Sequence, residues 1–221
     1  MKTNEELQCD VENAIKWEPL LDAAEIGVTA KDGVVTLTGT VDSYAKKTEA
    51  ESAAKKVAGV TALVEDIKIE YGSYWAKKND NEIATEILNA FKWNNEVPAD
   101  KLKVKVENGW VTIEGELGWN YQKEAAKDAV KNLLGVTGVS NNIKIKSEVD
   151  VIEQKGIEAA LKRNVYFNDE DIEVSVSDKN VILKGRVDSY YAKDEAERMA
   201  WNTPGVCRVV NELIIVNNYA D

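Results

Sequence analysis

The chemistry open to this chain is limited first by the absence of histidine from its 221 residues. Ser-His-Asp and Cys-His nucleophilic catalysis are therefore excluded, and a zinc site would lack its most usual nitrogen ligand. The densest group of carboxylates is Asp169-Glu170-Asp171, which precedes a predicted strand and has no counterpart elsewhere in the chain. We interpret it as a solvated loop, because it also lacks the glycine and the final glutamate of an EF-hand. The sequence predicts no enzyme, no cofactor and no metal site.

A second set of residues suits binding. Three lysines alternate with apolar residues along a predicted strand and therefore share one of its faces, and two tryptophans follow. Basic and aromatic groups together suit an anionic phospholipid surface or a protein partner, whereas a solvated sheet face is the alternative interpretation. The candidate interaction surface is Lys101, Lys103, Lys105, Trp110 and Trp119, with Lys144 and Lys146 as neighbours if the last strand presents them on the same side.

Two further tryptophans, Trp17 and Trp93, occupy equivalent positions, each after a lysine at the end of a predicted helix. Aromatic side chains dominate packing at interfaces, so we interpret these two as filling space between repeated units. The segment from Tyr71 to Trp75 contains three aromatic residues in five. It is predicted to be ordered and to dock between the first two units.

Charge argues against nucleic acid as a partner. The net charge is -11, and residues 1–75, 76–147 and 148–221 carry -6, +1 and -6 respectively. Phosphate neutralisation needs a basic footprint that the outer thirds oppose. The interaction hypothesis therefore centres on the middle third, and the alternative is a soluble protein that binds or senses a cation or small ligand.

The elements that position these residues belong to a sequence unit that is repeated three times. Gly33-Val34-Val35-Thr36-Leu37-Thr38-Gly39 recurs, with substitutions, as residues 109–115 and as residues 179–185. Each copy is followed by a Gly-Val pair at the same distance, so the register holds through its second half. The predicted domains are residues 1–71, 79–147 and 148–217. The glycines that we expect to be structural are Gly39, Gly59, Gly115, Gly135, Gly185 and Gly205. We expect Gly39 and its equivalents to lie where the strand turns tightly into the following helix.

Hydrophobic periodicity predicts the same five elements in each copy. Apolar residues at helical spacing open the unit, although Glu153 stands where the first apolar residue of the third copy belongs, so that helix should start late or be slightly rotated. Alternation then predicts a hairpin, turned by Asp32-Gly33 and Asn108-Gly109, and in the third copy by a left-handed Asn180. A second helix, ended by Gly59 and its equivalents, and a last strand follow. The fold class is α+β: three tandem αββαβ domains, each a three-stranded mixed sheet with two helices on one face.

This αββαβ unit, with a hydrophobic-rich strand closing on Gly39, Gly115 or Gly185, a helix, and a Gly-Val pair before the last strand, resembles the BON domain, named for bacterial osmotically induced and nodulation proteins. The resemblance covers residues 3 to 216, three times over. It implies a non-enzymatic bacterial protein of osmotic or envelope stress, transport-associated, with a proposed role in phospholipid interaction. Most familiar members of the family are exported.

Composition also bears on location and assembly. The chain is 44% hydrophobic and 30% charged, with no apolar run long enough to span a membrane and no apolar signal-peptide core near Met1. The expectation is a cytoplasmic protein, or a periplasmic one if a leader was removed. Cys9 and Cys207 are non-equivalent and predict no disulfide framework. Oligomeric state, whether monomer or weak oligomer, stays open at this point.

Overall fold

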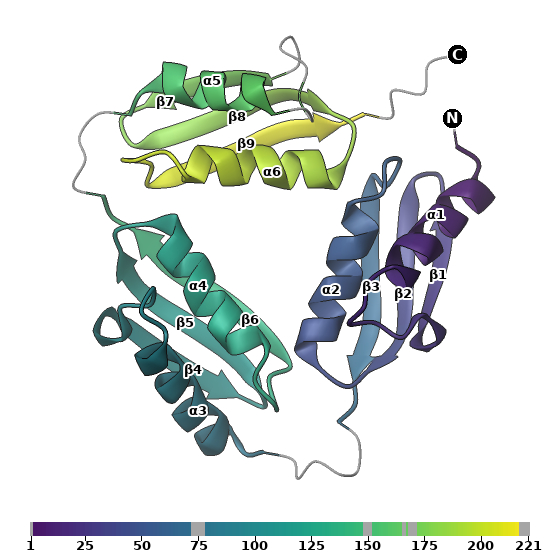
Figure 1. Cartoon of the computed structure of the whole chain (residues 1–221), viewed down its shortest axis with the longest axis horizontal. Coiled ribbons are helices and arrows are strands. Elements are labelled where there is room, and N and C mark those ends of the chain that lie inside the picture. Colours follow the sequence, from purple (N-terminus) through teal and green to yellow (C-terminus); the bar gives the residue numbers. More distant parts are fainter. Residues whose placement is uncertain (1, 72–77, 148–151, 165–166, 168–171, 217–221) are drawn as a thin grey trace.

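A computed structural model describes residues 2–71, 78–147, 152–164, 167 and 172–216. These residues form three domains with the same order of elements, as the repeat predicts (Figure 1). The first domain contains α1 (Asn4–Lys16), β1 (Ile26–Lys31), β2 (Val34–Val41), α2 (Tyr44–Lys55) and β3 (Ala62–Ile69). The second contains α3 (Asp80–Trp93), β4 (Leu102–Glu107), β5 (Trp110–Leu117), α4 (Asn120–Lys131) and β6 (Gly138–Ile145). The third contains α5 (Gln154–Arg163), β7 (Ile172–Ser177), β8 (Asn180–Val187), α6 (Tyr190–Trp201) and β9 (Arg208–Ile215).

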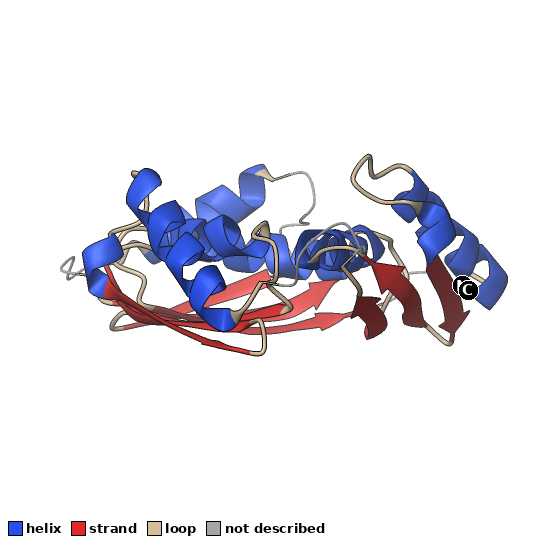
Figure 2. Cartoon of the chain, turned by 90° about the horizontal axis from the view of Figure 1, so that it is seen from below, coloured by secondary structure: helices blue, strands red, loops and turns tan. Residues whose placement is uncertain are grey.

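Each domain has one three-stranded mixed sheet with the second strand in the middle. In the first domain β1 pairs antiparallel with β2, and β2 pairs parallel with β3 across the crossover helix α2. The helices lie on one side of the three sheets, and the other side is left open (Figure 2). The predicted fold class is therefore confirmed.

The start of each first helix follows from local sequence. Thr3 caps α1 and forms a capping box with Glu6, and Asn79 does the same for α3 with Glu82. Glu153 precedes α5 without a side-chain cap bond, and this helix has 10 residues against 13 in α1. The late start predicted for the third copy is confirmed.

Each domain has its own core between its helices and its sheet. In the first domain Leu7, Val11 and Ile15 of α1 are buried, at the spacing of one helix face. Small residues of α2, including Ala50 and Ala54, are fully buried and allow that helix to lie close to the rest of the core. The alternating residues of β1 and β2 complete the cluster from the sheet side.

The hairpin turns differ from the prediction in the third domain. Asp32 and Gly33 have positive φ angles of 50° and 81°, and Asn108 and Gly109 have 52° and 79°, as predicted. In the third domain Asp178 has the positive φ, 53°, while Asn180 is the first residue of β8. The expectation for Asn180 is wrong, because the turn begins at the residue equivalent to Asp32, which can also adopt the left-handed region.

The repeated glycines also lie elsewhere than expected. Gly39 lies inside β2, opposite Ile26, rather than at a turn into the following helix. It has a φ of +137°, and a Cβ there would overlap the carbonyl oxygen of Glu25. Gly59 lies four residues beyond Lys55, the last residue of α2, so it belongs to the turn before β3 and does not cap the helix.

The three domains form a triangle in which α2, α4 and α6 face the centre (Figure 1). Tyr44 of α2 packs on the core of the second domain, Trp201 of α6 bridges the cores of the third and second, and Tyr190 of α6 packs on the first. The Tyr71 hydroxyl donates a hydrogen bond of 2.9 Å to the Val136 carbonyl of the second domain. The remainder of the aromatic segment, residues 72–75, lies outside the described residues. The domains therefore contact one another around a closed ring.

Candidate functional site

The five residues of the candidate interaction surface fall at two places in the second domain. Lys103 and Lys105 of β4 and Trp110 of β5 point to the open side of the sheet. Lys101 and Trp119 lie beyond the other end of β5, where Lys101 precedes β4 and Trp119 precedes α4. Strand alternation places Lys103 and Lys105 on one face correctly. The same prediction for Lys101 is wrong, because this residue lies before the strand begins.

The open face of the second domain carries carboxylates among its lysines. Glu114 pairs directly with Lys103 across the two strands. The Lys105 ammonium lies 2.8 Å from a carboxylate oxygen of Glu107, a pair in which both side chains are more than 60% exposed. Cross-strand and neighbouring opposite charges neutralise one another, so this face does not present a continuous cationic surface.

Trp110 is the large apolar residue on this face, with 51% of its surface exposed. Its ring lies over Gly138, the paired residue of β6, and its indole N–H donates a hydrogen bond of 2.9 Å to Ser140. The indole is therefore held flat on the sheet, with one ring face in solvent. Aromatic side chains surrounded by polar groups are typical of protein interfaces.

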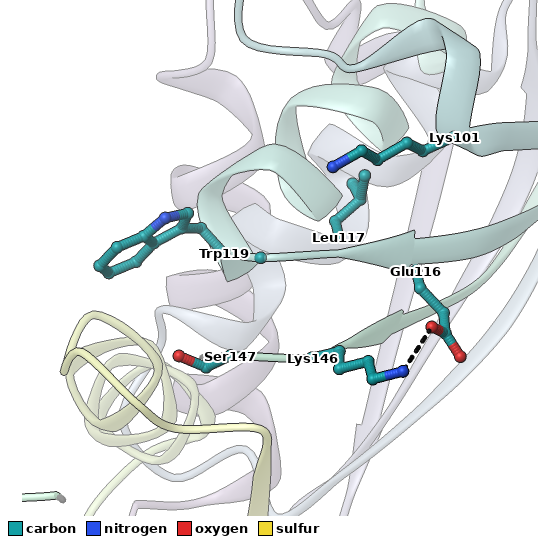
Figure 3. A pocket seen from close by; sticks show the side chains of 7 residues that line it. Lys101, Glu116, Leu117, Trp119, Lys146 and Ser147 are labelled. Carbon is teal, nitrogen blue, oxygen red and sulfur yellow. Dashed lines mark hydrogen bonds and ion pairs between the residues drawn. The ribbon is translucent and has the colours of Figure 1, made fainter. Parts of the chain in front are cut away.

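The second place is a pocket of about 790 Å³ at the ends of β5 and β6 (Figure 3). Its opening faces solvent, and the Lys146 ammonium lies 3.4 Å from a Glu116 carboxylate oxygen at its edge. The lining residues are Lys101, Glu116, Leu117, Gly118, Trp119, Lys146 and Ser147. The pocket combines an indole with two ammonium groups and one carboxylate.

Trp17 and Trp93 contradict the interpretation made from sequence. Their side chains fill no space between domains, since 84% and 87% of their surfaces are exposed. Trp17 is the C-cap of α1 and Trp93 is the last residue of α3, so each indole is carried at the tip of a first helix. The third domain has Arg163 at this position. Sequence reasoning identified the equivalence of the two tryptophans but not their exposure.

Two tyrosine hydroxyls at the junction of the first and second domains have raised pKa values. Burial raises the pKa of Tyr44 and of Tyr71 above the ordinary value, while hydrogen bonding to backbone of the second domain acts in the opposite direction. Both groups therefore stay protonated at neutral pH. Their role at the junction is packing and hydrogen bonding.

The described residues also bear on the metal, thiol and membrane features considered from sequence. No group of three or more Cys, Asp or Glu side chains in the described ranges could hold a metal ion. Asp169-Glu170-Asp171 lies outside those ranges. Cys9 and Cys207 carry free thiols. Over the same described ranges, no helix has the length and hydrophobicity needed to cross a membrane.

Comparison with known proteins gives a family match over most of the chain. The BON domain model matches three times, at residues 3–71, 79–147 and 150–217. "Osmotically-inducible protein Y" of Escherichia coli is 30% identical over 129 residues, which are 57% of this chain and 64% of that protein. A "21 kDa hemolysin" of Actinobacillus pleuropneumoniae is 33% identical over 131 residues, 58% of this chain and 66% of that protein. The matched segments thus span less than two thirds of each relative.

Among solved structures, two of CdsD, described as a structural protein of the type III secretion system of Chlamydia trachomatis, align with 17% identity. The alignments cover 94% and 97% of this chain and 91% and 100% of the two structures. Their TM-scores are 0.27 and 0.26. Scores this low support no inference about the present chain.

Proposed function

Since the chain belongs to the BON domain family and is related to an osmotically inducible protein, we propose that it is a non-catalytic stress protein that docks on anionic phospholipid surfaces. The observation that carries this proposal is the exposure of Trp17 and Trp93, 84% and 87%, at equivalent helix tips. Indole groups favour the boundary between lipid headgroups and water, where the ring is apolar and the N–H stays hydrated.

The layering of the domains supports a planar target. All three sheets lie on one side and the helices on the other, so α1 and α3 belong to the same layer (Figure 2). Lys16 and Lys92 directly precede the two tryptophans. A lysine near an anionic membrane contributes about 1 kcal/mol, and the chain's net charge of -11 opposes approach. The contact should therefore be weak and sensitive to salt.

The test is co-sedimentation with vesicles of phosphatidylcholine, alone and mixed with phosphatidylglycerol. The double variant Trp17→Ser, Trp93→Ser should lose binding to the mixed vesicles. Trp110→Ser, which removes an indole from the open sheet face, is the matched control and should bind normally. Equal binding by the wild type and the double variant would contradict the proposed contact.

The lysine row predicted from sequence is tested in the same experiment. The double variant Lys103→Glu, Lys105→Glu should retain vesicle binding, because Glu114 and Glu107 already neutralise these lysines. Loss of binding in this variant, with the helix-tip variant unaffected, would move the lipid contact to the open sheet face.

A second candidate function is binding of a protein partner through that open face, favoured by the half-exposed indole of Trp110 among mixed charges. Such a patch resembles the aromatic centre and polar rim of protein interfaces more than a membrane contact. Absence of vesicle binding by the wild type would favour this candidate. Cross-linking of the wild type and of the Trp110→Ser variant would then identify partners whose binding depends on the indole.

A further inference from the structure

The three domains allow the same position to be compared in three interfaces. In the first domain the residues that begin α2 are Ser43, whose hydroxyl accepts from the Lys46 N–H, and Tyr44, which packs on the next domain. The third domain repeats this arrangement with Ser189 and Tyr190.

The second domain departs from both. The equivalent residues are Trp119 and Asn120, and no side chain caps the N-terminus of α4. The tyrosine that fills the junction at the other two places is therefore missing here, and the pocket of about 790 Å³ lies beside this position. All of its lining residues belong to the second domain, and one of them, Ser147, also contacts the third domain by accepting a hydrogen bond of 2.7 Å from the Lys179 ammonium at its carbonyl.

The charge of the pocket is also specific to the second domain. Lys101 is exposed, and the structure gives its ammonium no ion pair or hydrogen bond within the described residues. Figure 3 shows the Lys101 side chain extended over Leu117, whereas the Lys146 side chain points toward Glu116. The positions equivalent to Lys101, Gly118 and Lys146 in the first domain are acidic, namely Glu25, Asp42 and Glu70. Three positions that are acidic in the first domain are thus occupied by two lysines and a glycine in the second.

We propose that this pocket binds an organic phosphate, with the phosphate at the Lys101 ammonium and the organic part against Trp119 and Leu117, while Lys146 stays paired with Glu116 at the edge. Lysine acts as a compact point charge and suits phosphate, whereas planar carboxylates are matched best by arginine. The volume lies within the roughly 300–1,000 Å³ range of small-molecule sites. The first-turn N–H groups of α4, which no side chain caps, add partial positive charge nearby.

The ligand chemistry has two sources, a soluble organic phosphate and the headgroup of a phospholipid. The probes are glycerol 3-phosphate for the first source and dihexanoyl phosphatidic acid, below its micelle-forming concentration, for the second. Binding to the full chain is measured by isothermal titration calorimetry at low ionic strength, with glycerol as the uncharged comparison. Binding of glycerol 3-phosphate would indicate a soluble organic phosphate as the ligand, and binding of dihexanoyl phosphatidic acid would indicate a phospholipid headgroup. Glycerol should give no heat of binding.

Three variants make the assignment specific. Lys101→Glu should weaken binding about tenfold or more, the loss expected when a charge-assisted hydrogen bond is removed. Trp119→Ser installs the capping residue of the other two domains, so it should fold well and still lose affinity. Lys103→Glu changes the same charge two residues away, on the open sheet face, and should bind like the wild type.

Three results would overturn the proposal. The first is no heat of binding with either charged probe, and the second is wild-type affinity in all three variants. The third is an equal loss of affinity in Lys101→Glu and Lys103→Glu. The helix-tip variant Trp17→Ser, Trp93→Ser separates this proposal from the membrane contact. It should bind the soluble probes normally, so failure of vesicle docking and failure of the pocket are read from different experiments.

Discussion

Replacing Gly115 by alanine tests the explanation given for the repeated strand glycine. Gly115 lies in β5 opposite Leu102, with a φ of +154°. A Cβ at this position would overlap the carbonyl oxygen of Lys101 and would lie 2.9 Å from Leu102 Cδ2. The obstructing oxygen belongs to the backbone just before β4, which cannot move without shifting the start of that strand.

The expected magnitude follows from this geometry. A residue held in a sparsely populated backbone region costs about 1–3 kcal/mol, and displacement of the backbone ahead of β4 adds to that cost. Gly118→Ala is the matched control, because nothing lies within 4 Å of a Cβ built there and its φ is not in the left-handed range. At such a site alanine is neutral or stabilises by about 0.4–1 kcal/mol through the unfolded chain.

Scanning calorimetry of the full chain measures both variants. For a domain of this size about 1 kcal/mol corresponds to a 4–8 °C change in Tm, so Gly115→Ala should lower the transition of the second domain by roughly 4–24 °C. Gly118→Ala should leave it unchanged or raise it. Equal Tm values for the two variants would refute the argument that close backbone approach requires glycine at position 115.

Two further predictions concern packing and pH. Gly138→Ala should destabilise the second domain by about 1 kcal/mol, because its Cβ would overlap the Trp110 ring, and adding Trp110→Val, which recreates the first domain's residues at both positions, should restore the urea midpoint. Hydrogen bonds from Arg198 hold the pKa of Glu195 below its ordinary value of 4.5, so the pair stabilises the fold above that pH and its contribution is lost as pH falls through the lowered pKa. Glu195→Gln should therefore lower Tm at pH 7, with the difference from wild type vanishing in acid.

The sequence was sufficient for the fold because repetition supplied three independent readings of each element. Burial of Leu7, Val11 and Ile15 follows from helical spacing, and the hairpins follow from strand alternation and turn residues. The late start of α5 followed from a single substitution, Glu153. These features are local, and each is decided by residues within one or two turns of chain.

The sites were harder to predict because they depend on contacts between distant residues. Periodicity places Lys103 and Lys105 on one face but does not show that Glu114 stands opposite Lys103, since that depends on strand register. The pocket lies beside Trp119, where the other two copies have a serine, and no single copy reveals this difference. Comparing the residues at Ser43 and Trp119 across the repeats is the sequence signal that could have indicated it.

The prediction for the strand glycines was wrong for the same reason, because their role also depends on contacts between distant residues. Gly39 was expected to serve a turn, and the structure instead brings it against the backbone at Glu25, a residue 14 positions earlier in the chain. A repeated glycine shows that a side chain is disfavoured. It does not show which part of the molecule occupies the space, and that requires the tertiary arrangement.

Closure of the ring has a consequence for the connectivity of the chain. Tyr190 packs on the core of the first domain, so the last copy is a neighbour of the first although no peptide joins them. Each copy then has two neighbours, so the contacts between copies do not depend on which copy comes first in the chain. A circular permutant that starts at the second domain and joins the third to the first should preserve all three junctions. In its packing the chain therefore resembles a cyclic trimer whose three copies are joined covalently.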